Sequence, residues 1–327
     1  SMARLALKNG KFCECVKFCD KAIERLTSRN QHPTDTEAFY LKGLALQYLG
    51  QYKESYDILY RAAWNYAHRS AAMFELACLD CREKDYVAAL EKIDESIGLN
   101  RGHTKAQNLR TAILRALGCD KAKENAEINV KDDLLDLFAL VEYSHFADCS
   151  DKIAQFALKS ENILDVAKDY MKAGLFEDAL YALSLDRGNS PLIDYYRAYI
   201  NAQLGREFVA DIKVAEEKET GYCFPCALED IAVLEFAIAS SAATANAEYY
   251  LGCLLYDRFR YDDAAEHWNA SVTKNGAHGK SWRNLSLYYF DKKNDGERAK
   301  YCMEKALEFK GDDPRLLLEY EQLLKNM

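Results

Sequence analysis

Two pairs of cysteines have the CxxC spacing that can chelate zinc or support thiol–disulfide chemistry, Cys78-Leu-Asp-Cys81 and Cys223-Phe-Pro-Cys226. A zinc site of this kind requires a second pair nearby, and these two pairs lie about 145 residues apart. Cys78 and Cys81 also fall inside a predicted helix, whereas a redox pair usually stands at a helix N-terminus. We therefore interpret both pairs as small side chains that pack between helices, and we expect neither a metal site nor a cofactor.

The segment GAHGKS at 276–281 ends like a phosphate-binding loop. That loop requires a glycine at 274, where Lys274 stands, and no predicted strand precedes the segment. We interpret it as a turn that leads into a helix near Trp282. The chain also lacks HExxH, GxSxG and a Gly-rich dinucleotide fingerprint, so we expect no enzyme in this region. An activity elsewhere in a longer protein stays open.

The amino-acid composition limits the fold classes that can position these residues. Of 327 residues, 49% are hydrophobic and 29% are charged, which is a globular balance. Only 4 Pro and 15 Gly are too few for the many tight turns of an all-β fold, so the sequence predicts a mostly helical protein. The net charge of −9 disfavours nucleic acid as a partner. No apolar run approaches the roughly 20 residues that span a bilayer, and we expect a cytoplasmic protein with reduced cysteines and no membrane partner.

Internal repetition with a period near 34 residues organises the chain. Tyr52 and Tyr86 are 34 residues apart, and Gly50 and Gly118 are 68 apart. The same period links the two helix faces Glu248, Leu251, Gly252, Leu255 and Trp282, Leu285, Ser286, Tyr289. Each unit is therefore expected to repeat the same packing face.

The second half of each unit has a small, a large and a small residue at spacings of four and three. These triplets are Cys15-Cys19-Ala22, Ser55-Leu59-Ala62, Ala89-Ile93-Ser96, Ala264-Trp268-Ser271 and Ala299-Met303-Ala306. The spacing places each triplet on one helix face, where the small residues allow close helix approach. A Gly-x-aromatic turn, at Gly10, Gly50 and Gly174, precedes such helices and accepts the left-handed conformation that ends a first helix.

These positions together resemble the tetratricopeptide repeat family. The best matching segments are 39–62, 73–96, 163–183, 248–271 and 282–306. The resemblance implies an all-α, right-handed helical-repeat solenoid of about seven to eight helix pairs. The first unit is short, and with the Ser1-Met2 start it suggests that the given sequence begins inside a longer protein.

The expected organisation has four parts. Residues 1–125 hold N-terminal repeats, 126–160 an irregular helical joint, 161–218 degenerate repeats, and 219–327 C-terminal repeats with a capping helix. Within the last part, 219–240 is expected as a helix that interrupts the period.

A narrower resemblance links the segments 221–238, 248–268, 281–290 and 313–323 to the C-terminal repeat region of large bacterial proteins. In that group an uncharacterised β-rich, carbohydrate-related module precedes a tetratricopeptide array. The resemblance implies a bacterial protein whose array accompanies a sugar-related module. It implies no reaction for the array itself.

In a solenoid of this kind the first helices line a groove, so residues beside their packing face are candidates for binding. The candidate groove residues are Tyr249, Tyr256, Asp257, Trp282, Arg283, Phe290 and Asp291. Tyr and Arg combine large contact area with directional hydrogen bonds. We expect a noncatalytic protein–protein interaction scaffold that binds a peptide, its own upstream domain or another copy of itself. The alternative is one wall of a carbohydrate site completed by the upstream module.

Overall fold

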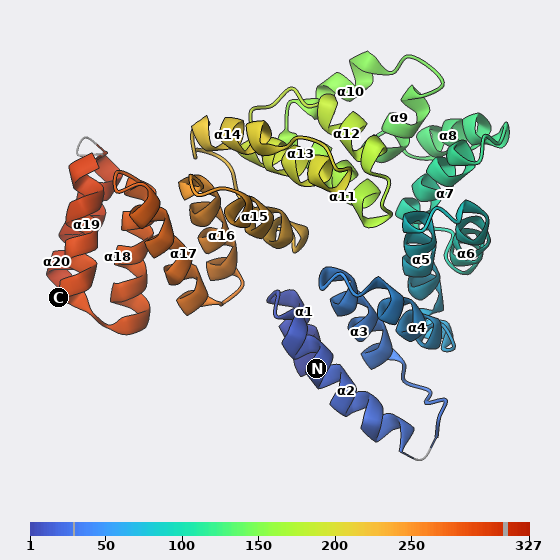
Figure 1. The fold of residues 1–327 in the computed structure, drawn as a ribbon, viewed down its shortest axis with the longest axis horizontal. Coiled ribbons are helices and arrows are strands. Elements are labelled where there is room, and N and C mark those ends of the chain that lie inside the picture. Colours follow the sequence, from blue (N-terminus) through green and yellow to red (C-terminus); the bar gives the residue numbers. More distant parts are fainter. Residues whose placement is uncertain (29, 310–312) are drawn as a thin grey trace. The chain divides into compact units, whose positions relative to one another are not determined.

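The computed structural model describes residues 1–28, 30–309 and 313–327. Every regular element in these ranges is a helix, which confirms the predicted all-α class (Figure 1). None of these helices has the length and apolar character needed to cross a bilayer. The chain divides into two compact units, unit 1 (Ser1–Asn189) and unit 2 (Ser190–Met327), which we describe separately.

Unit 1 consists of six consecutive helix pairs. Its helices are α1 (Met2–Lys8), α2 (Phe12–Thr27), α3 (Glu37–Tyr48), α4 (Tyr52–Ala62), α5 (Tyr66–Arg82), α6 (Tyr86–Leu99), α7 (Thr104–Ala116), α8 (Lys121–Asp132), α9 (Leu137–Ser144), α10 (Ser150–Ala157), α11 (Ser160–Lys172) and α12 (Phe176–Ser184). The segment 126–160, expected as an irregular joint, contains the end of α8 and the short pair α9 and α10.

Unit 2 contains three further pairs and two single helices. Its helices are α13 (Pro191–Gln203), α14 (Val209–Glu217), α15 (Glu229–Ser240), α16 (Ala245–Asp257), α17 (Tyr261–Lys274), α18 (Gly279–Lys293), α19 (Gly296–Phe309) and α20 (Pro314–Asn326). The described residues thus hold nine pairs, slightly more than the sequence predicts. The pair α9 and α10 lies in a segment that the sequence analysis does not count as a repeat.

The predicted packing triplets are buried between helices, except for Ala22, which is half-buried. Ala62, Ile93 and Met303 are at most 1% exposed. The large residue of a triplet packs against a small residue on the first helix of the same pair. Gly43 is an example, because a Cβ there would lie 2.5 Å from Leu59 side-chain atoms. The repeat is therefore built as the sequence predicts, by close approach of paired helices.

The predicted turn glycines adopt the left-handed conformation. Gly10, Gly50 and Gly174 have φ angles of 69°, 72° and 70°. In other pairs the same turn position holds a residue with a side chain, and those residues are Lys84, Phe259 and Asn294, all with positive φ. The turn geometry is thus kept where glycine is absent, at a cost in backbone strain.

Helix α15 packs against α13 and α16, within the segment expected to interrupt the period. The expected helix over 219–240 is wrong in its first half, because 219–228 forms a loop. The start of α15 is fixed by Asp230, whose buried carboxylate accepts hydrogen bonds from the backbone N–H groups of Cys226 (2.8 Å) and Ala227 (2.9 Å). The Tyr196 hydroxyl of α13 donates to the same carboxylate at 2.5 Å. One buried acid in the first turn of α15 therefore fixes the loop that precedes the helix and ties it to α13.

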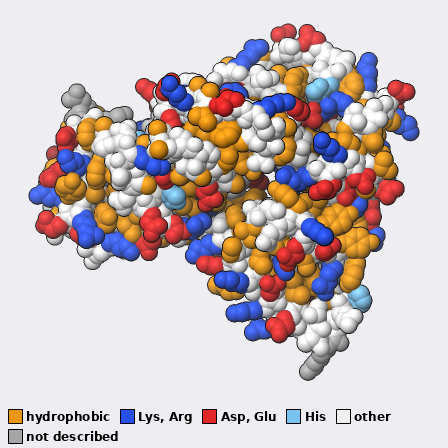
Figure 2. All heavy atoms as spheres, viewed as in Figure 1, with side chains coloured by type: hydrophobic (Ala, Val, Ile, Leu, Met, Phe, Trp, Pro, Cys, Tyr) orange, Lys and Arg blue, Asp and Glu red, His pale blue; other side chains and the backbone are white. Residues whose placement is uncertain are grey.

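The surface shows no segregation of charge on the face drawn in Figure 2. Hydrophobic, acidic and basic side chains are interspersed over both units on that face. Candidate sites are therefore identified below from individual contacts.

Candidate binding site

A row of polar side chains joins the first helices of unit 2. The Asn284 amide of α18 donates to the Cys253 sulfur of α16 at 3.4 Å. The Arg283 guanidinium of α18 forms two hydrogen bonds of 2.6 Å with the Glu319 carboxylate of α20. Together with Tyr249 we call these residues the first-helix row. All five are half-buried, so the row presents part of each side chain to solvent.

The row combines neutral hydrogen-bonding groups with one internal ion pair. Burial raises the pKa of Cys253 to about 11 and raises the pKa of Tyr249 well above its ordinary value. Hydrogen bonding to Arg283 holds the pKa of the Glu319 carboxyl below its ordinary value. At neutral pH the thiol and phenol are therefore protonated, and Cys253 is a poor nucleophile. This chemistry suits recognition of amide groups and side chains.

Two predicted residues, Tyr249 and Arg283, belong to this row. Two others face second helices. The Tyr256 ring lies 4.8 Å from the Tyr261 ring and 5.4 Å from the Trp268 ring of α17. The Trp282 indole donates to the Gly276 carbonyl at 2.8 Å, and its ring lies 6.0 Å from that of Tyr301 on α19.

The remaining predicted residues lie elsewhere on the same helices. Phe290 is partly buried against the apolar cluster that contains Met303 and Leu316. Asp257 and Asp291 are exposed at the C-terminal ends of α16 and α18. The seven predicted residues thus lie in several different environments. Tyr256 contacts α17, whereas Trp282 contacts α19.

Three members of the row, Cys253, Asn284 and Glu319, are not among the seven candidate groove residues. Asn284 directly follows a predicted residue, but the 34-residue period assigns it to no groove position. Glu319 lies on α20, which the sequence predicts only as a cap. The one signal that points to it is charge complementarity with Arg283.

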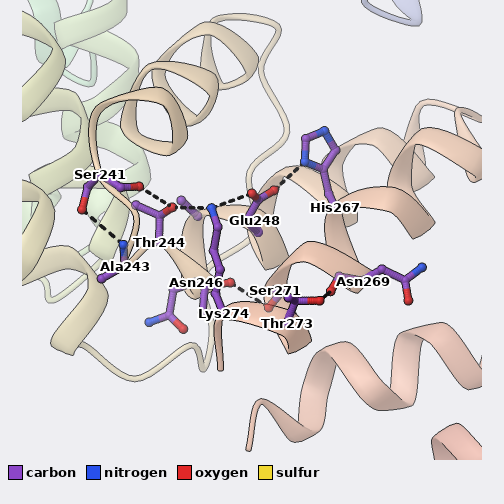
Figure 3. A network of polar contacts seen from close by, with 12 residues as sticks. Ser241, Ala243, Thr244, Asn246, Glu248, His267, Asn269, Ser271, Thr273 and Lys274 are labelled. Atoms are coloured by element: carbon purple, nitrogen blue, oxygen red, sulfur yellow. Dashed lines mark hydrogen bonds and ion pairs between the residues drawn. The ribbon is translucent and has the colours of Figure 1, made fainter. Parts of the chain in front are cut away.

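A polar network fixes the N-terminal part of α16, where Glu248 directly precedes Tyr249 (Figure 3). The Glu248 carboxylate contacts the Lys274 amine at 2.7 Å and the His267 ring nitrogen Nδ1 at 2.6 Å, both on α17. Lys274 also donates to the Thr244 hydroxyl at 2.9 Å. Burial opposes ionisation of Glu248, but hydrogen bonds from His267 and Lys274 hold the pKa of this carboxyl below its ordinary value.

The N-terminus of α16 receives a second carboxylate, from α14. Glu216 accepts hydrogen bonds from the backbone N–H groups of Asn246 (2.8 Å) and Ala247 (2.9 Å). The Tyr195 hydroxyl of α13 donates to the same carboxylate at 2.5 Å. A negative group at a helix N-terminus is stabilising, so Glu216 anchors the start of α16 to the pair before it.

In unit 1 the corresponding helices are bridged by the chain itself. Lys172, at the end of α11, forms an ion pair with the buried Glu75 of α5. The Arg82 guanidinium of α5 donates to the Met171 carbonyl at 2.9 Å. The Lys105 amine of α7 lies 2.7 Å from the Asp169 carboxylate. Figure 1 shows α11 and α5 approaching each other within this unit.

The pair Cys78 and Cys81 and the glycine segment take the places predicted for packing and turns, whereas the prediction is wrong for the second pair: Cys223 and Cys226 lie in the loop before α15, and Cys226 is exposed. Cys78 and Cys81 are each 1% exposed, and burial raises the pKa of Cys81 to about 12. Within the described residues, no group of three His, Cys, Asp or Glu side chains is placed to hold a metal ion. The segment 276–281 forms the turn and first residues of α18.

Two open hollows lie in unit 1. One, of about 330 Å³, is lined by residues that include Ser144, Tyr181 and Arg187. The other, of about 390 Å³, is lined by residues of α1, α2 and α3, among them Phe18 and Leu41. Neither contains a residue predicted from the sequence.

No family model matches the chain. Among solved structures it is similar to YrrB, described as a TPR protein with an unusual peptide-binding site, at 15% identity over 70% of this chain and 97% of YrrB, with a TM-score of 0.31. It is also similar to the P58(IPK) TPR domain, at 12% identity over 99% of this chain and 97% of that domain, with a TM-score of 0.32. A third similar structure is the C-terminal part of a TPR repeat-containing protein from Cytophaga hutchinsonii, at 13% identity over 87% of this chain and 98% of that one, with a TM-score of 0.37.

Proposed function

We propose that the protein is a noncatalytic scaffold that binds a polypeptide segment along the first-helix row of unit 2. One observation carries the proposal: three helices present partly exposed polar side chains that contact one another from helix to helix. Asn284 and Tyr249 are neutral donors and acceptors at neutral pH. A peptide backbone, which offers alternating N–H and C=O groups, is a ligand of matching chemistry.

The ion pair between Arg283 and Glu319 gives the row a charged end. Its side chains are 25% and 19% exposed, so a ligand can reach them at modest desolvation cost. A peptide side chain with an amide or a hydroxyl can join this pair without separating it. We therefore expect recognition by hydrogen bonds and aromatic contact, with little dependence on ionic strength.

The experiment is selection of a random twelve-residue phage-displayed peptide library on the full chain, followed by binding measurements on a synthetic selected peptide. We expect Asn284→Ala and Tyr249→Ala each to weaken binding by about tenfold, since each removes a group worth roughly 1–2 kcal/mol. Asn269→Ala is the matched control, because Asn269 is exposed on α17 and its amide donates within its own helix. Equal affinity of Asn284→Ala and the unchanged protein, or failure to enrich any peptide, would contradict the proposal.

A further inference from the structure

Phe259 is an unexpected residue at its position in the repeat. It stands at the turn between α16 and α17 with φ of 58°, where the turns at Gly50, Gly118 and Gly205 have glycine. A bulky side chain is disfavoured in this left-handed conformation. The Phe259 ring also gains little from burial, because the residue is 70% exposed. Stability of the fold therefore does not account for phenylalanine here.

The loop before α15 contains a second case of the same kind. Tyr222 has φ of 54° and is 93% exposed, and Phe224 two residues later is 73% exposed. Strained backbone together with exposed aromatic rings is more typical of binding surfaces than of packing. Unit 2 thus carries two such residues in neighbouring loops.

The loop runs along α16 toward the turn that holds Phe259. At one end the buried Cys223 thiol lies against the Tyr250 side chain. At the other end the Arg258 guanidinium donates to the Cys226 carbonyl. Tyr250 lies on α16 and Arg258 directly follows its last residue, and eight residues of helix correspond to about 12 Å. An extended peptide of about four residues covers that length.

The negative charge of the sequence around these rings favours a basic ligand. The stretch 207–266 contains thirteen Asp and Glu residues against four Lys and Arg residues, so its net charge of −9 equals that of the whole chain. The two arginines beside Phe259 are already engaged: Arg258 contacts the Cys226 carbonyl, and Arg260 lies 2.6 Å from the Asp263 carboxylate. Arg258 also lies 3.8 Å from the Asp257 carboxylate, whose side chain is 73% exposed.

The same corner of unit 2 already contains a cation–aromatic contact. The Lys292 amine lies 4.2 Å from the centre of the Tyr261 ring, and the Phe259 ring lies 6.2 Å from that ring. A lysine or arginine of a partner can bind the exposed Phe259 ring in the same way. Acidic residues nearby strengthen such a contact and repel phosphate groups.

We propose that Tyr222, Phe224 and Phe259 form a docking surface for a basic peptide segment of a partner protein, separate from the first-helix row. The cationic side chains of the segment contact the three rings and lie within the acidic field of 207–266. The left-handed conformation at positions 222 and 259 holds two of these rings out in solvent.

The test is isothermal titration of the full chain with the tetrapeptide Lys-Arg-Lys-Arg, amidated and acetylated, in 50 mM NaCl. We expect Phe259→Gly and Tyr222→Gly each to weaken binding by about fivefold, although neither changes a charge. Phe259→Gly should at the same time raise the melting temperature by about 2–4 °C, because glycine relieves the left-handed strain. Gain of stability with loss of binding distinguishes a docking residue from a structural one.

Two matched variants control the measurement. Lys84→Gly replaces a residue with φ of 62° at the equivalent turn of unit 1, and should raise stability without changing peptide affinity. Tyr66→Ala removes a tyrosine that is 77% exposed in unit 1, and should leave binding unchanged. Equal affinity of the unchanged protein and Phe259→Gly, absence of binding to the basic tetrapeptide, or equal binding of Glu-Glu-Glu-Glu would overturn the proposal.

Discussion

The first helices of the two units are built on the same repeat but face different surroundings. In unit 1, Lys172 and Asp169 of α11 reach α5 and α7 and form ion pairs with Glu75 and Lys105. In unit 2, the first-helix row links α16 to α18 and α18 to α20, and its side chains stay partly exposed. Unit 1 therefore closes part of this surface with contacts between helix pairs that are distant in sequence, whereas the row of unit 2 joins successive repeats and stays partly exposed.

A glycine permits the closed arrangement of unit 1. A Cβ at Gly174 would lie 3.0 Å from the Arg82 Cα, and the φ of 70° disfavours any side chain. The comparison teaches that a few residues at helix ends decide whether a repeat surface is occupied by its own chain. The residues that form the pairs themselves are alike in both units.

The substitution Gly174→Ala tests the difference between the two units with the largest expected effect. We expect a loss of about 3 kcal/mol in the free energy of unfolding of unit 1, from left-handed strain plus a clash with the Arg82 backbone. Urea denaturation of the full chain measures it. Gly118→Ala is the control, since φ there is 65° but no atom lies within 4 Å of the added Cβ, and it should cost only about 1 kcal/mol. Equal losses in both variants would show that the close contact with Arg82 carries no energy.

Removing the bridging charge should have the next largest effect. Lys172→Met leaves the buried Glu75 carboxylate without its ammonium partner, and we expect a loss of about 2 kcal/mol, less than for a fully buried pair because Lys172 is 30% exposed. The double variant Lys172→Met with Glu75→Gln should recover most of this loss. Hydrogen exchange should localise the change to α11 and α5, and a change confined to α1–α4 would contradict the assignment.

How much of the fold and of the candidate site could be predicted from the sequence depends on how far apart in the chain the contacting residues lie. The helix pairs, the buried triplets and the turn glycines follow from local spacing, and the structure confirms them. The contact between Lys172 and Glu75 joins residues 97 positions apart. The 34-residue period does not indicate which helix surfaces are covered by other parts of the chain. Phe259 and Tyr222 could not be found from the period either, because their signal is a φ angle. The seven candidate groove residues as one site stay a prediction.

In unit 2 the network around Glu248 gives a pH-dependent prediction. The pKa of this carboxyl is lowered in the folded protein, so its contribution to stability is complete above its ordinary pKa of 4.5 and is lost as the pH falls through the lowered value. We expect Glu248→Gln to cost about 1.5 kcal/mol at pH 7 and to remove this part of the acid sensitivity. Urea midpoints between pH 7 and pH 3 measure both effects. Glu266→Gln, at an exposed position of α17, should follow the unchanged protein.

The smallest expected effect concerns the end of the first-helix row. Arg283→Ala removes both hydrogen bonds to Glu319, and because both side chains are partly exposed we expect a loss of about 0.5–1 kcal/mol. Amide exchange in α20 should accelerate while exchange in α16 stays unchanged. Slower or unaltered exchange in α20 would show that the ion pair does not hold the final helix.

The bridge across unit 1 also sets an order of events during synthesis. In an array with contacts only between neighbours, each helix pair can complete its packing as soon as the next one is made. Glu75 and Arg82 instead wait for a partner that lies about 90 to 97 residues downstream. At about 5–20 residues per second on the ribosome, that interval lasts about 5–20 seconds. During this time the Glu75 carboxylate and the Arg82 guanidinium have only their upstream partners, the Gln47 amide and the Tyr52 hydroxyl, and the surface that α11 later covers stays open to other contacts of the nascent chain.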